Sequence, residues 1–394
     1  MSTPHAATHP QDLAEIAERF QVFADQVVTR LPLYRRLCTG AAGDPDVCAR
    51  LLLAAPNQRT PNLLLAAVHD VLLAGALEPL ADWYPSVSGR NPSTDARSRP
   101  VGRGEDDPWP HFRAMALHHP EVEHLLRTRS TQTNEVGRSA TLFPGLYQAL
   151  VSGSSGLGAL RPLSLIEIGS SAGLNLHPGN YGYRYRRAAT GGEPEQVLTS
   201  VGSSSKLMLD CELRGDLVPP LPEASLPIDD AVGLDVHPLD VTEPLDARWL
   251  VACQWPEEQA RLARLRAAIA LAYEDPPPVR AADAVTELRS YVERVPSHAL
   301  PVVVSTWVLT YLPIDRQQEL IAILDLIGSR RDLAMVFSEQ PERVPGIPVP
   351  PRPDGGPDGR ATALVRIEWR RGDRTITRLA DQHPHGKWME WLGA

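Results

Sequence analysis

Lysine is nearly missing from this sequence: Lys206 and Lys387 are the only two, and arginine supplies the rest of the 39 basic residues. Few candidates therefore exist for Schiff-base or amine catalysis. Basic residues are outnumbered by 48 acidic ones, which gives a net charge of -9. A nucleic-acid-binding protein needs a concentrated basic surface to neutralise phosphates, so this class of protein is not expected.

Cysteine is also scarce, with four widely spaced residues. No CxxC pair and no Cys/His spacing typical of a metal site occurs, so we expect no bound metal and predict reduced thiols in a cytoplasmic protein. No apolar run approaches the roughly 18 residues of a membrane span. Residues 1–13 lack the apolar core of a signal peptide. We therefore predict a cytoplasmic protein with no membrane or nucleic-acid partner.

Several catalytic motifs are absent from the sequence. It has no GxSxG elbow, no HExxH, no P-loop lysine motif and no full dinucleotide fingerprint. These absences argue against hydrolase, metalloprotease and kinase functions.

The length of 394 residues suits two or three domains. Residues 1–150 show helical periodicity, with helix starts marked by Asp44-Pro45 and Thr60-Pro61. From residue 151 to 394, short apolar runs alternate with helical patterns, which favours a parallel α/β sheet. We predict a mostly helical N-terminal region, 1–150, followed by an α/β domain, 151–394.

The second region contains most of the strand candidates. They are 163–168, 206–213, 231–236, 249–253, 300–309 and 333–338, with helical patterns at 257–273, 281–295 and 315–327. After a proline- and glycine-rich loop over 344–359, the runs 363–369 and 375–379 predict a hairpin that closes the sheet.

The sharpest local signal is the sequence from Glu167 to Gly173, EIGSSAG, where a strand runs into a turn of small residues. Backbone N–H groups in such a turn can converge on an anion. The pattern resembles the glycine loop of class I S-adenosylmethionine-dependent methyltransferases, E/D-x-G-x-G-x-G, whose acidic residue and glycines hold the cofactor. Ser171 replaces the central glycine, and Pro178 curtails the following helix. An ordinary turn, a substrate or anion pocket, and a methyl-donor site all stay open.

Other polar groups also follow the predicted elements. The cluster Thr131–Glu135 with Arg138 suits recognition of a small zwitterion, although it could be a solvated helix cap. Trp255 follows an apolar run and could stack on a ligand or pack in the core. Asp240 belongs to a strand-end set with Asp235 and His237 that suits proton transfer or an exposed turn.

Five motifs, taken in chain order, resemble the actinobacterial domain of unknown function 2332 family. They are TQTNEVGRSATLFPGL from Thr131, LIEIGSSAGLNL from Leu165, CQWPEEQARLARL from Cys253, VVVSTWVLTYL from Val302 and HGKWMEWL from His385. The resemblance spans nearly the whole chain. It implies a helical N-terminal region on a degenerate methyltransferase-like, Rossmann-like sheet, and it names no reaction.

The chain also resembles the larger subunit of the enzymes that close aziridine rings in azinomycin-type antibiotic biosynthesis. This resemblance implies a lyase without a methyl donor, in which an amine displaces a neighbouring sulfate within one amino-acid-derived substrate. It also implies a second small protein as partner.

Under this interpretation the polar residues take specific roles. The loop Gly169–Gly173 with Asn175 would bind an anionic group, and Arg138 a carboxylate or sulfate. Glu135 or Asp240 would be the base, and the sequence leaves both open. The predicted substrate-binding residues are Gln132, Asn134, Arg138, Gly169, Ser170, Ser171, Gly173, Asn175 and Trp255.

The resulting prediction is an α/β enzyme that acts on a small amino-acid-derived metabolite without a bound cofactor. The alternatives are an S-adenosylmethionine-dependent methyltransferase and a non-catalytic subunit that only presents a ligand.

Overall fold

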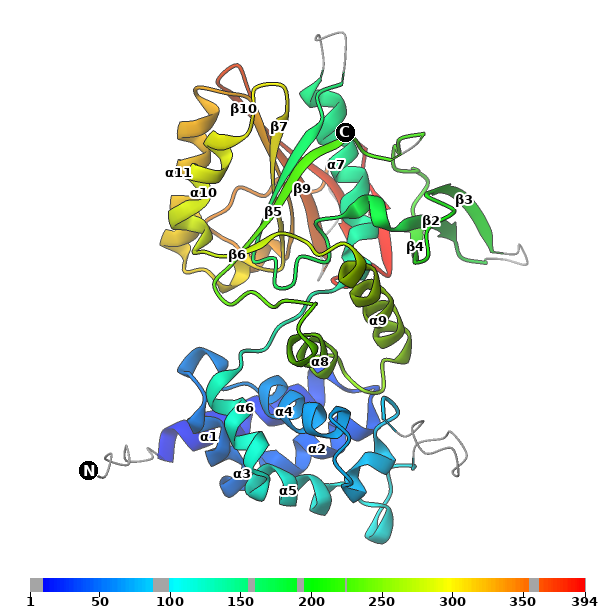
Figure 1. The fold of residues 1–394 in the computed structure, drawn as a ribbon, viewed down its shortest axis with the longest axis vertical. Coiled ribbons are helices and arrows are strands. Elements are labelled where there is room, and N and C mark those ends of the chain that lie inside the picture. The colour runs from blue at the N-terminus through cyan, green and yellow to red at the C-terminus, as the bar shows by residue number, and fades with distance from the viewer. Residues whose placement is uncertain are drawn as a thin grey trace. The chain divides into compact units, whose positions relative to one another are not determined.

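The structure is a computed structural model that describes residues 10–87, 99–154, 160–189, 195–223, 225–353 and 361–393. Most of the N-terminal segment discussed above, and parts of the loops over 84–109 and 344–359, lie outside the described residues. The chain divides into two compact units, coloured along the chain in Figure 1. The first comprises Met1–Thr133 and Glu243–Arg266, and the second Asn134–Thr242 and Ala267–Ala394.

The unit boundary therefore differs from the predicted division at residue 150. The physical reason is helix α7, Ser139–Gly153, whose apolar residues pack against strands of the second unit. The chain also returns to the first unit with helix α8, Pro244–Ala252, and leaves it within α9, Gln259–Glu274.

The first unit is helical, as predicted. Its helices besides α8 and the start of α9 are α1 (Pro10–Val22), α2 (Pro32–Ala42), α3 (Pro45–Arg50), α4 (Pro61–Leu73), α5 (Trp109–His118) and α6 (Pro120–Thr128). The predicted start at Asp44 is confirmed, because its Oδ1 accepts the amides of Asp46 and Val47 at 3.1 Å each. Nearly all of α4 is buried, and it packs on α6 and α8.

The predicted strand over 249–253 is wrong, because most of these residues belong to α8. Pro244 occupies the first turn of that helix, a position that suits its fixed φ and missing N–H. The run Trp249–Ala252 is apolar because it is buried in a helical core. Periodicity alone does not separate a short buried helix segment from a strand.

The second unit is built on one eleven-stranded sheet. The strands are β1 (Leu163–Ile168), β2 (Gly182–Arg187), β3 (Gln196–Val201), β4 (Met208–Arg214), β5 (Ile228–Asp235), β6 (Val279–Ala281), β7 (Leu300–Thr306), β8 (Leu333–Glu339), β9 (Thr362–Arg370), β10 (Asp373–Gln382) and β11 (Trp388–Trp391). Their order is β3-β2-β4-β11-β10-β9-β8-β7-β1-β5-β6. The parallel part, β6-β5-β1-β7-β8, reads 3-2-1-4-5 in chain order, which is the Rossmann arrangement. The α/β prediction is thus confirmed.

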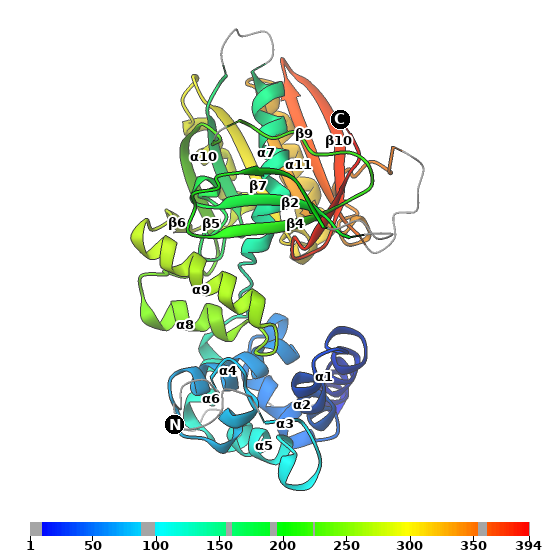
Figure 2. The same cartoon turned by 90° about the vertical axis from the view of Figure 1, so that its right-hand side faces the viewer.

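Helices cover both faces of this sheet, as Figures 1 and 2 show. Helices α10 (Ala284–Arg294) and α11 (Ile314–Gly328) bury one face in a core that includes Ile166, Val303 and Phe337. Helix α7 lies on the other face, where Gly145 approaches Val336 of β8. The strand ends between these two layers position the candidate site.

Two further sequence predictions concern the connections of the sheet. The helix expected to be cut short after β1 is replaced by a 3-10 turn, Pro178–Asn180, and by β2. The hairpin of β9 and β10 is confirmed, but it does not close the sheet. Strand β10 pairs with β11, which pairs in turn with β4, because the β2–β4 insertion extends the sheet beyond the hairpin.

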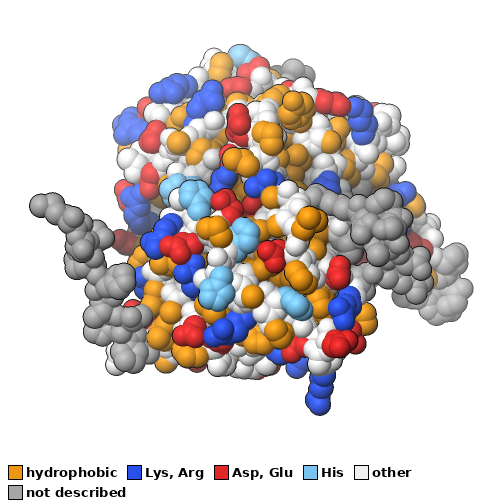
Figure 3. Space-filling model, turned by 60° about the horizontal axis from the view of Figure 1, so that its bottom comes forward, with side chains coloured by type: hydrophobic (Ala, Val, Ile, Leu, Met, Phe, Trp, Pro, Cys, Tyr) orange, Lys and Arg blue, Asp and Glu red, His pale blue; other side chains and the backbone are white. Residues whose placement is uncertain are grey.

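The surface shows mixed charge. On the face drawn in Figure 3, basic and acidic side chains are interspersed with hydrophobic ones. Among the described residues, no helix is long and apolar enough to cross a membrane. Within the same residues, no group of three or more His, Cys, Asp or Glu side chains is arranged to hold a metal ion.

Candidate functional site

The candidate site lies at the carboxyl ends of β1, β7 and β8. Strands β1 and β7 are neighbours, and the next strands of the parallel part, β5 and β8, lie on opposite sides of this pair. Ligands of open α/β sheets bind at such a switch point, outside the carboxyl ends of the strands. The register pairs Ile168 with Ser305, and Thr306 with Ser338. The three strands therefore end level with one another and form one rim.

Buried polar atoms without a hydrogen-bond partner in the protein gather at this rim. They are Glu167 Oε2, Ser170 Oγ, Ser171 Oγ, Asn175 Nδ2, Ser305 Oγ, Trp307 Nε1, Glu339 Oε2, Thr362 Oγ1 and Gln382 Oε1. An unpaired buried polar group costs roughly 1–3 kcal/mol, so such groups are paired in native proteins or serve a function. Their concentration at the switch point indicates a site for a small polar ligand.

Glu167 is the central ionisable group of the rim. It is the penultimate residue of β1 and only 2% exposed. Burial raises the pKa of Glu167 to about 8, and the neighbouring charge of Asp235 acts in the same direction. Asn175 and the positive charge of Arg138 oppose this rise. A carboxyl group in this range exchanges its proton near neutral pH, as a general base or acid must.

Two asparagines tie the loop after β1 to the start of α7. Asn134 Oδ1 accepts the amide of Leu174 at 2.9 Å. Asn175 Oδ1 accepts the hydroxyl of Ser139 at 2.7 Å. Both side chains were predicted to bind substrate, and both are buried at the rim, where part of their hydrogen-bonding capacity holds the loop.

Arg138 supplies a buried positive charge at the rim. Its Nε donates to the carbonyl of Pro384 at 2.9 Å and its Nη1 to that of Thr306 at 3.2 Å, and the residue is 7% exposed. Glu339 is the last residue of β8, and burial raises its pKa to about 7. Its Oε1 accepts the amides of Val308 and Leu309 at 2.7 and 2.8 Å. The positive charge of Arg138 thus acts on two buried carboxyl groups, and it partly offsets the rise that burial causes in the pKa of each.

The turn between β10 and β11 holds Arg138 in place. A Cβ atom on Gly137 would lie 2.6 Å from the carbonyl oxygen of His385, so the two backbones are in direct contact. Within the turn, Gly386 donates to the carbonyl of His383 at 2.9 Å. The sequence left the C-terminal histidines as either pocket residues or a tail anchor. The structure places their turn against the segment that carries Arg138.

The glycine loop itself offers few donors to an anion. The amides of Gly169 and Ser171 donate to Leu234 O at 2.7 Å and to Asp235 Oδ2 at 2.8 Å. Gly173 donates within the loop, to Ser170 O at 2.8 Å. Because these N–H groups already have acceptors in the protein, the predicted role of the loop in binding an anion has little support from its geometry.

A side chain of the protein fills the space beside Gly169. A Cβ atom on Gly169 would lie 2.4 Å from Val308 Cγ2, so a side chain of the protein already makes the close approach that glycine permits. Asp235, at the end of β5, accepts the amides of Ser171 and His237 at 2.8 Å each with its two oxygens. These residues do not fit S-adenosylmethionine in the manner of a class I methyltransferase.

The two predicted bases have different surroundings. Glu135 is 4% exposed, and its Oε1 accepts the amide of Gly137 at 3.1 Å. Asp240 is exposed, and the amide and hydroxyl of Thr242 hold the pKa of Asp240 below its usual range. A lowered pKa makes a carboxylate a weaker base, so Glu167 is the stronger candidate.

Gln132 and Trp255 belong to the first unit. Trp255 packs edge-on against Phe23, with ring centroids 5.9 Å apart, and its Nε1 donates to Asn62 Oδ1 at 3.2 Å. A backbone hydrogen bond of Gln132 reaches the Cys253 thiol. These contacts give both residues a place in the packing of the helical unit.

Three residues of the rim, Ser305, Glu339 and Gln382, were not candidates from the sequence, and Trp307 stood in the strand-end candidate 306–311, for which core packing was the expectation. Trp307 has a left-handed backbone, φ 57°, which is uncommon for a bulky residue and concentrates at functional sites. The only signal in the sequence was that three of these residues end or follow apolar strand runs, where α/β proteins bind ligands.

The fold and the candidate site together define a Rossmann-like α/β protein with a cluster of buried, unpaired polar atoms at the carboxyl ends of its central strands. The family model described as an uncharacterized protein conserved in bacteria (DUF2332) matches residues 17–391. The chain therefore belongs to the DUF2332 family. No curated protein and no solved structure matches the chain.

Proposed function

We propose that this protein is a biosynthetic enzyme that acts on a small amino-acid-derived substrate without a bound cofactor. In its most specific form, the proposed reaction is the displacement of a sulfate group by an amine of the same molecule, which closes an aziridine ring. The observation that carries the proposal is Glu167, a buried carboxyl group with one unpartnered oxygen and a pKa near 8, beside Arg138 at the switch point. The specific reaction comes from the resemblance to aziridine-forming enzymes.

The reaction balances with one base and one leaving group. Ionised Glu167 takes a proton from the substrate ammonium, and the freed nitrogen lone pair forms a bond to the neighbouring carbon. The carbon–oxygen bond breaks, and its electron pair leaves with the sulfate. A site that holds the amine opposite the leaving group contributes much of the rate, because orientation replaces a random encounter.

Donors at the same rim suit the departing sulfate. The guanidinium of Arg138 carries a positive charge, and Trp307 Nε1 is a buried N–H donor without a protein acceptor. Preorganised donors stabilise charge that develops in a transition state. A second small protein, which the same resemblance implies, is proposed as a partner of the enzyme.

A methyltransferase is the second candidate, because the 3-2-1-4-5 strand order and the acid at the end of β5 favour it. Two observations argue against a methyltransferase: the Val308 side chain packs against Gly169, and the Asp235 carboxylate already accepts two backbone amides. Calorimetry with S-adenosylmethionine separates the candidates, since micromolar binding would overturn the cofactor-free proposal.

Sulfate release from L-serine O-sulfate and 2-aminoethyl hydrogen sulfate tests the displacement. The full chain is assayed alone and with any small protein that copurifies with it, by ion chromatography and product mass. Ring closure keeps the nitrogen in an aziridine, whereas elimination from the serine ester ends in pyruvate. Sulfate release no faster with the protein than in buffer alone would overturn the displacement proposal.

A Glu167→Gln variant separates an enzyme from a ligand-presenting subunit. Loss of the base predicts a fall in turnover of at least about a hundredfold, with little change in the affinity for L-serine O-sulfate or 2-aminoethyl hydrogen sulfate. Glu135→Gln is the matched control and is expected to retain more activity. Equal losses of turnover and affinity in Glu167→Gln would favour a presenting role.

A further inference from the structure

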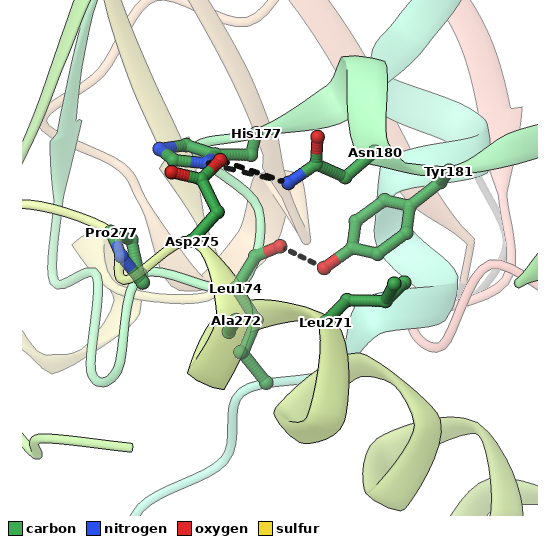
Figure 4. Close-up of a pocket in the computed structure, with 9 residues that line it drawn as sticks. Leu174, His177, Asn180, Tyr181, Leu271, Ala272, Asp275 and Pro277 are labelled. Carbon is green, nitrogen blue, oxygen red and sulfur yellow. Dashed lines mark hydrogen bonds and ion pairs between the residues drawn. The ribbon is translucent and has the colours of Figure 1, made fainter. Parts of the chain in front are cut away.

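Two hollows of the second unit differ greatly in size. The cavity of Figure 4, beside Tyr181, His177 and Asp275, has a volume of about 10 Å³, which is room for about one water molecule. The other hollow is a groove of about 350 Å³, a volume in the range of pockets that hold small molecules. The groove therefore has room for an organic ligand, whereas the small cavity does not.

The groove lies along the amino-terminal half of β1 and β5. Ser164 and Ile166 of β1 line it, and the register pairs them with two lining residues of β5, Asp230 and Val232. Ile166 belongs to the core under α10 and α11, whereas Glu167, the next residue along the strand, faces the opposite side of the sheet. The groove is thus separate from the rim, which lies at the carboxyl ends of the strands.

One wall of the groove is an open edge of the sheet. Strand β6 pairs with β5 only at Gly233–Asp235, so the described chain places no strand beside β5 before Gly233. The amide of Gly233 donates toward the β6 side, to Pro278 O at 2.9 Å. Backbone groups two residues apart point to the same side of a strand, so the N–H of Ala231, which also lines the groove, points to this open edge. It offers a main-chain donor to a ligand.

The other walls of the groove are largely apolar and aromatic. Val295 and Pro296, which follow α10, line it together with Val232 of the sheet. Tyr291 of α10 is half-buried in the lining, and the guanidinium carbon of Arg294 lies 5.2 Å from the centroid of its ring. Aromatic rings pack well against such surfaces. The walls therefore suit a flat, apolar ligand body.

Two arginines give the groove its charge. Arg280 of β6 and Arg294 of α10 both line it and are both exposed. Arg280 Nη1 donates to the carbonyl of Val279 at 3.0 Å, and among the described residues neither guanidinium forms an ion pair. Asp230 brings one carboxylate to the lining, so positive charge exceeds negative charge there. Guanidinium groups bind carboxylates through paired N–H donors, which indicates an acidic ligand.

The end of α10 does not cancel this positive charge. Carbonyl groups at a helix C-terminus carry partial negative charge, which disfavours a nearby anion. Arg331 Nη1 donates to the carbonyls of Val292 and Val295 at 3.0 and 2.9 Å. These carbonyl groups are therefore already engaged, and a third guanidinium offsets their partial charge.

We propose that this groove binds an aromatic carboxylate, at a site separate from the rim. The carboxylate accepts hydrogen bonds from Arg280 and Arg294, and the Ala231 amide supplies a further donor. The aromatic ring packs against Tyr291 and Val232. A neutral ligand of the same shape keeps the packing but loses the charge-assisted hydrogen bonds, so the groove selects the acid.

Calorimetry on the full chain tests the site with two pairs of probes. They are indole-3-acetate with indole-3-acetamide, and 3-phenylpropanoate with 3-phenylpropanamide, so each pair shares a ring and differs in charge. We expect both acids to bind at least about tenfold more tightly than their amides, because hydrogen bonds to charged groups are the stronger ones. Arg280→Gln and Arg294→Gln should each lower the affinity for the acids at least about fivefold and change amide binding little.

Arg289→Gln is the matched control. Arg289 is an exposed residue of the same helix, pairs with Glu293 at 2.7 Å and lies outside the lining of the groove, so its variant should keep the native affinity for the acids. Failure of both acids to bind at millimolar concentration would overturn the proposal, as would equal affinities for acids and amides. Acid binding that survives both Arg280→Gln and Arg294→Gln would also overturn it, because the ligand would then bind elsewhere. None of these measurements involves sulfate release, so the proposed function stands or falls by its own test.

Discussion

Gly386 stands directly against Gly137. A Cβ atom at position 386 would lie 1.9 Å from the Gly137 carbonyl oxygen, and Gly386 has φ 68°. The contact joins the turn between β10 and β11 to the segment that carries Arg138. This contact between two glycines far apart in the sequence thus helps to position Arg138, whose charge acts on Glu167 and Glu339.

Gly386→Ala is expected to destabilise the protein and to move Arg138. The new methyl group meets backbone atoms and forces a left-handed alanine, which together cost about 2–4 kcal/mol of unfolding free energy. Urea unfolding measures this loss. Gly372→Ala is the matched control, because Gly372 has φ 91° and nothing within 4 Å of its Cβ position. Its backbone strain alone predicts about 1 kcal/mol, and equal losses would show that the Gly137 contact is unimportant.

The first unit offers a test of a buried ion pair. Arg248 donates from Nε and Nη2 to the two oxygens of Asp70 at 3.0 and 2.9 Å, and Asp70 is 1% exposed. Arg248→Met leaves this carboxylate without its partner, and we expect a loss of about 2–3 kcal/mol, reduced from the fully buried case because Arg248 is partly exposed. Thermal or urea unfolding checks the value.

Adding Asp70→Asn to Arg248→Met removes the uncompensated charge and should recover much of the loss. Lys206→Met breaks the exposed Lys206–Glu274 pair, 2.8 Å apart, and serves as control with little expected effect. A double variant as unstable as Arg248→Met would mean that lost packing, not charge, causes the effect.

Much of the fold could be predicted from local chemistry. The strand runs ending at Ile168 and Ser338 were apolar and short, as buried parallel strands are. Pro178 correctly indicated that no full helix follows the glycine loop. Strand β6 was missed, because three residues carry too little periodicity to be recognised. The pairing of β11 with β4 joins segments far apart in sequence, which no local pattern encodes.

The site was only partly predictable for the same reason. The residues from Asn134 to Arg138 and from Gly169 to Asn175 form contiguous polar motifs and could be read locally. Glu339 carries no such motif, and its importance arises from burial beside Arg138 after the strands assemble. The sequence left Trp255 as a ligand stacker or a core residue, and the structure packs it edge-on against Phe23 of the helical unit.

Arg138→Gln is expected to raise the pKa of both Glu167 and Glu339, because its positive charge lowers them in the native protein. If Glu167 is the base, activity rises with pH as Glu167 ionises, and the midpoint of this rise should move upward in the variant. Arg214→Gln, which changes an exposed arginine above the Trp388 ring, is the control and should keep the native midpoint. A profile of Arg138→Gln that coincides with the native one would contradict the electrostatic role.

Protein stability should itself fall as the pH rises toward 8. The folded-state pKa values of Glu167 and Glu339, about 8 and about 7, exceed the unfolded value near 4.5. Between these values the folded protein holds protons that the unfolded chain has released, so stability present below pH 4.5 is lost as pH rises through the folded pKa. Each group contributes a slope of up to about 1.4 kcal/mol per pH unit.

Urea unfolding of Glu167→Gln and the native protein between pH 5 and pH 9 measures this contribution. Glutamine stays neutral, so the variant should lose less stability across this interval than the native protein, and the difference should level off above about pH 8. Glu195→Gln, at the partly exposed Arg186–Glu195 pair, is a control whose pH dependence should follow the native curve. Parallel curves for Glu167→Gln and the native protein would show that Glu167 ionises in the folded state as an ordinary carboxyl group does, which would remove the physical basis for its role as base.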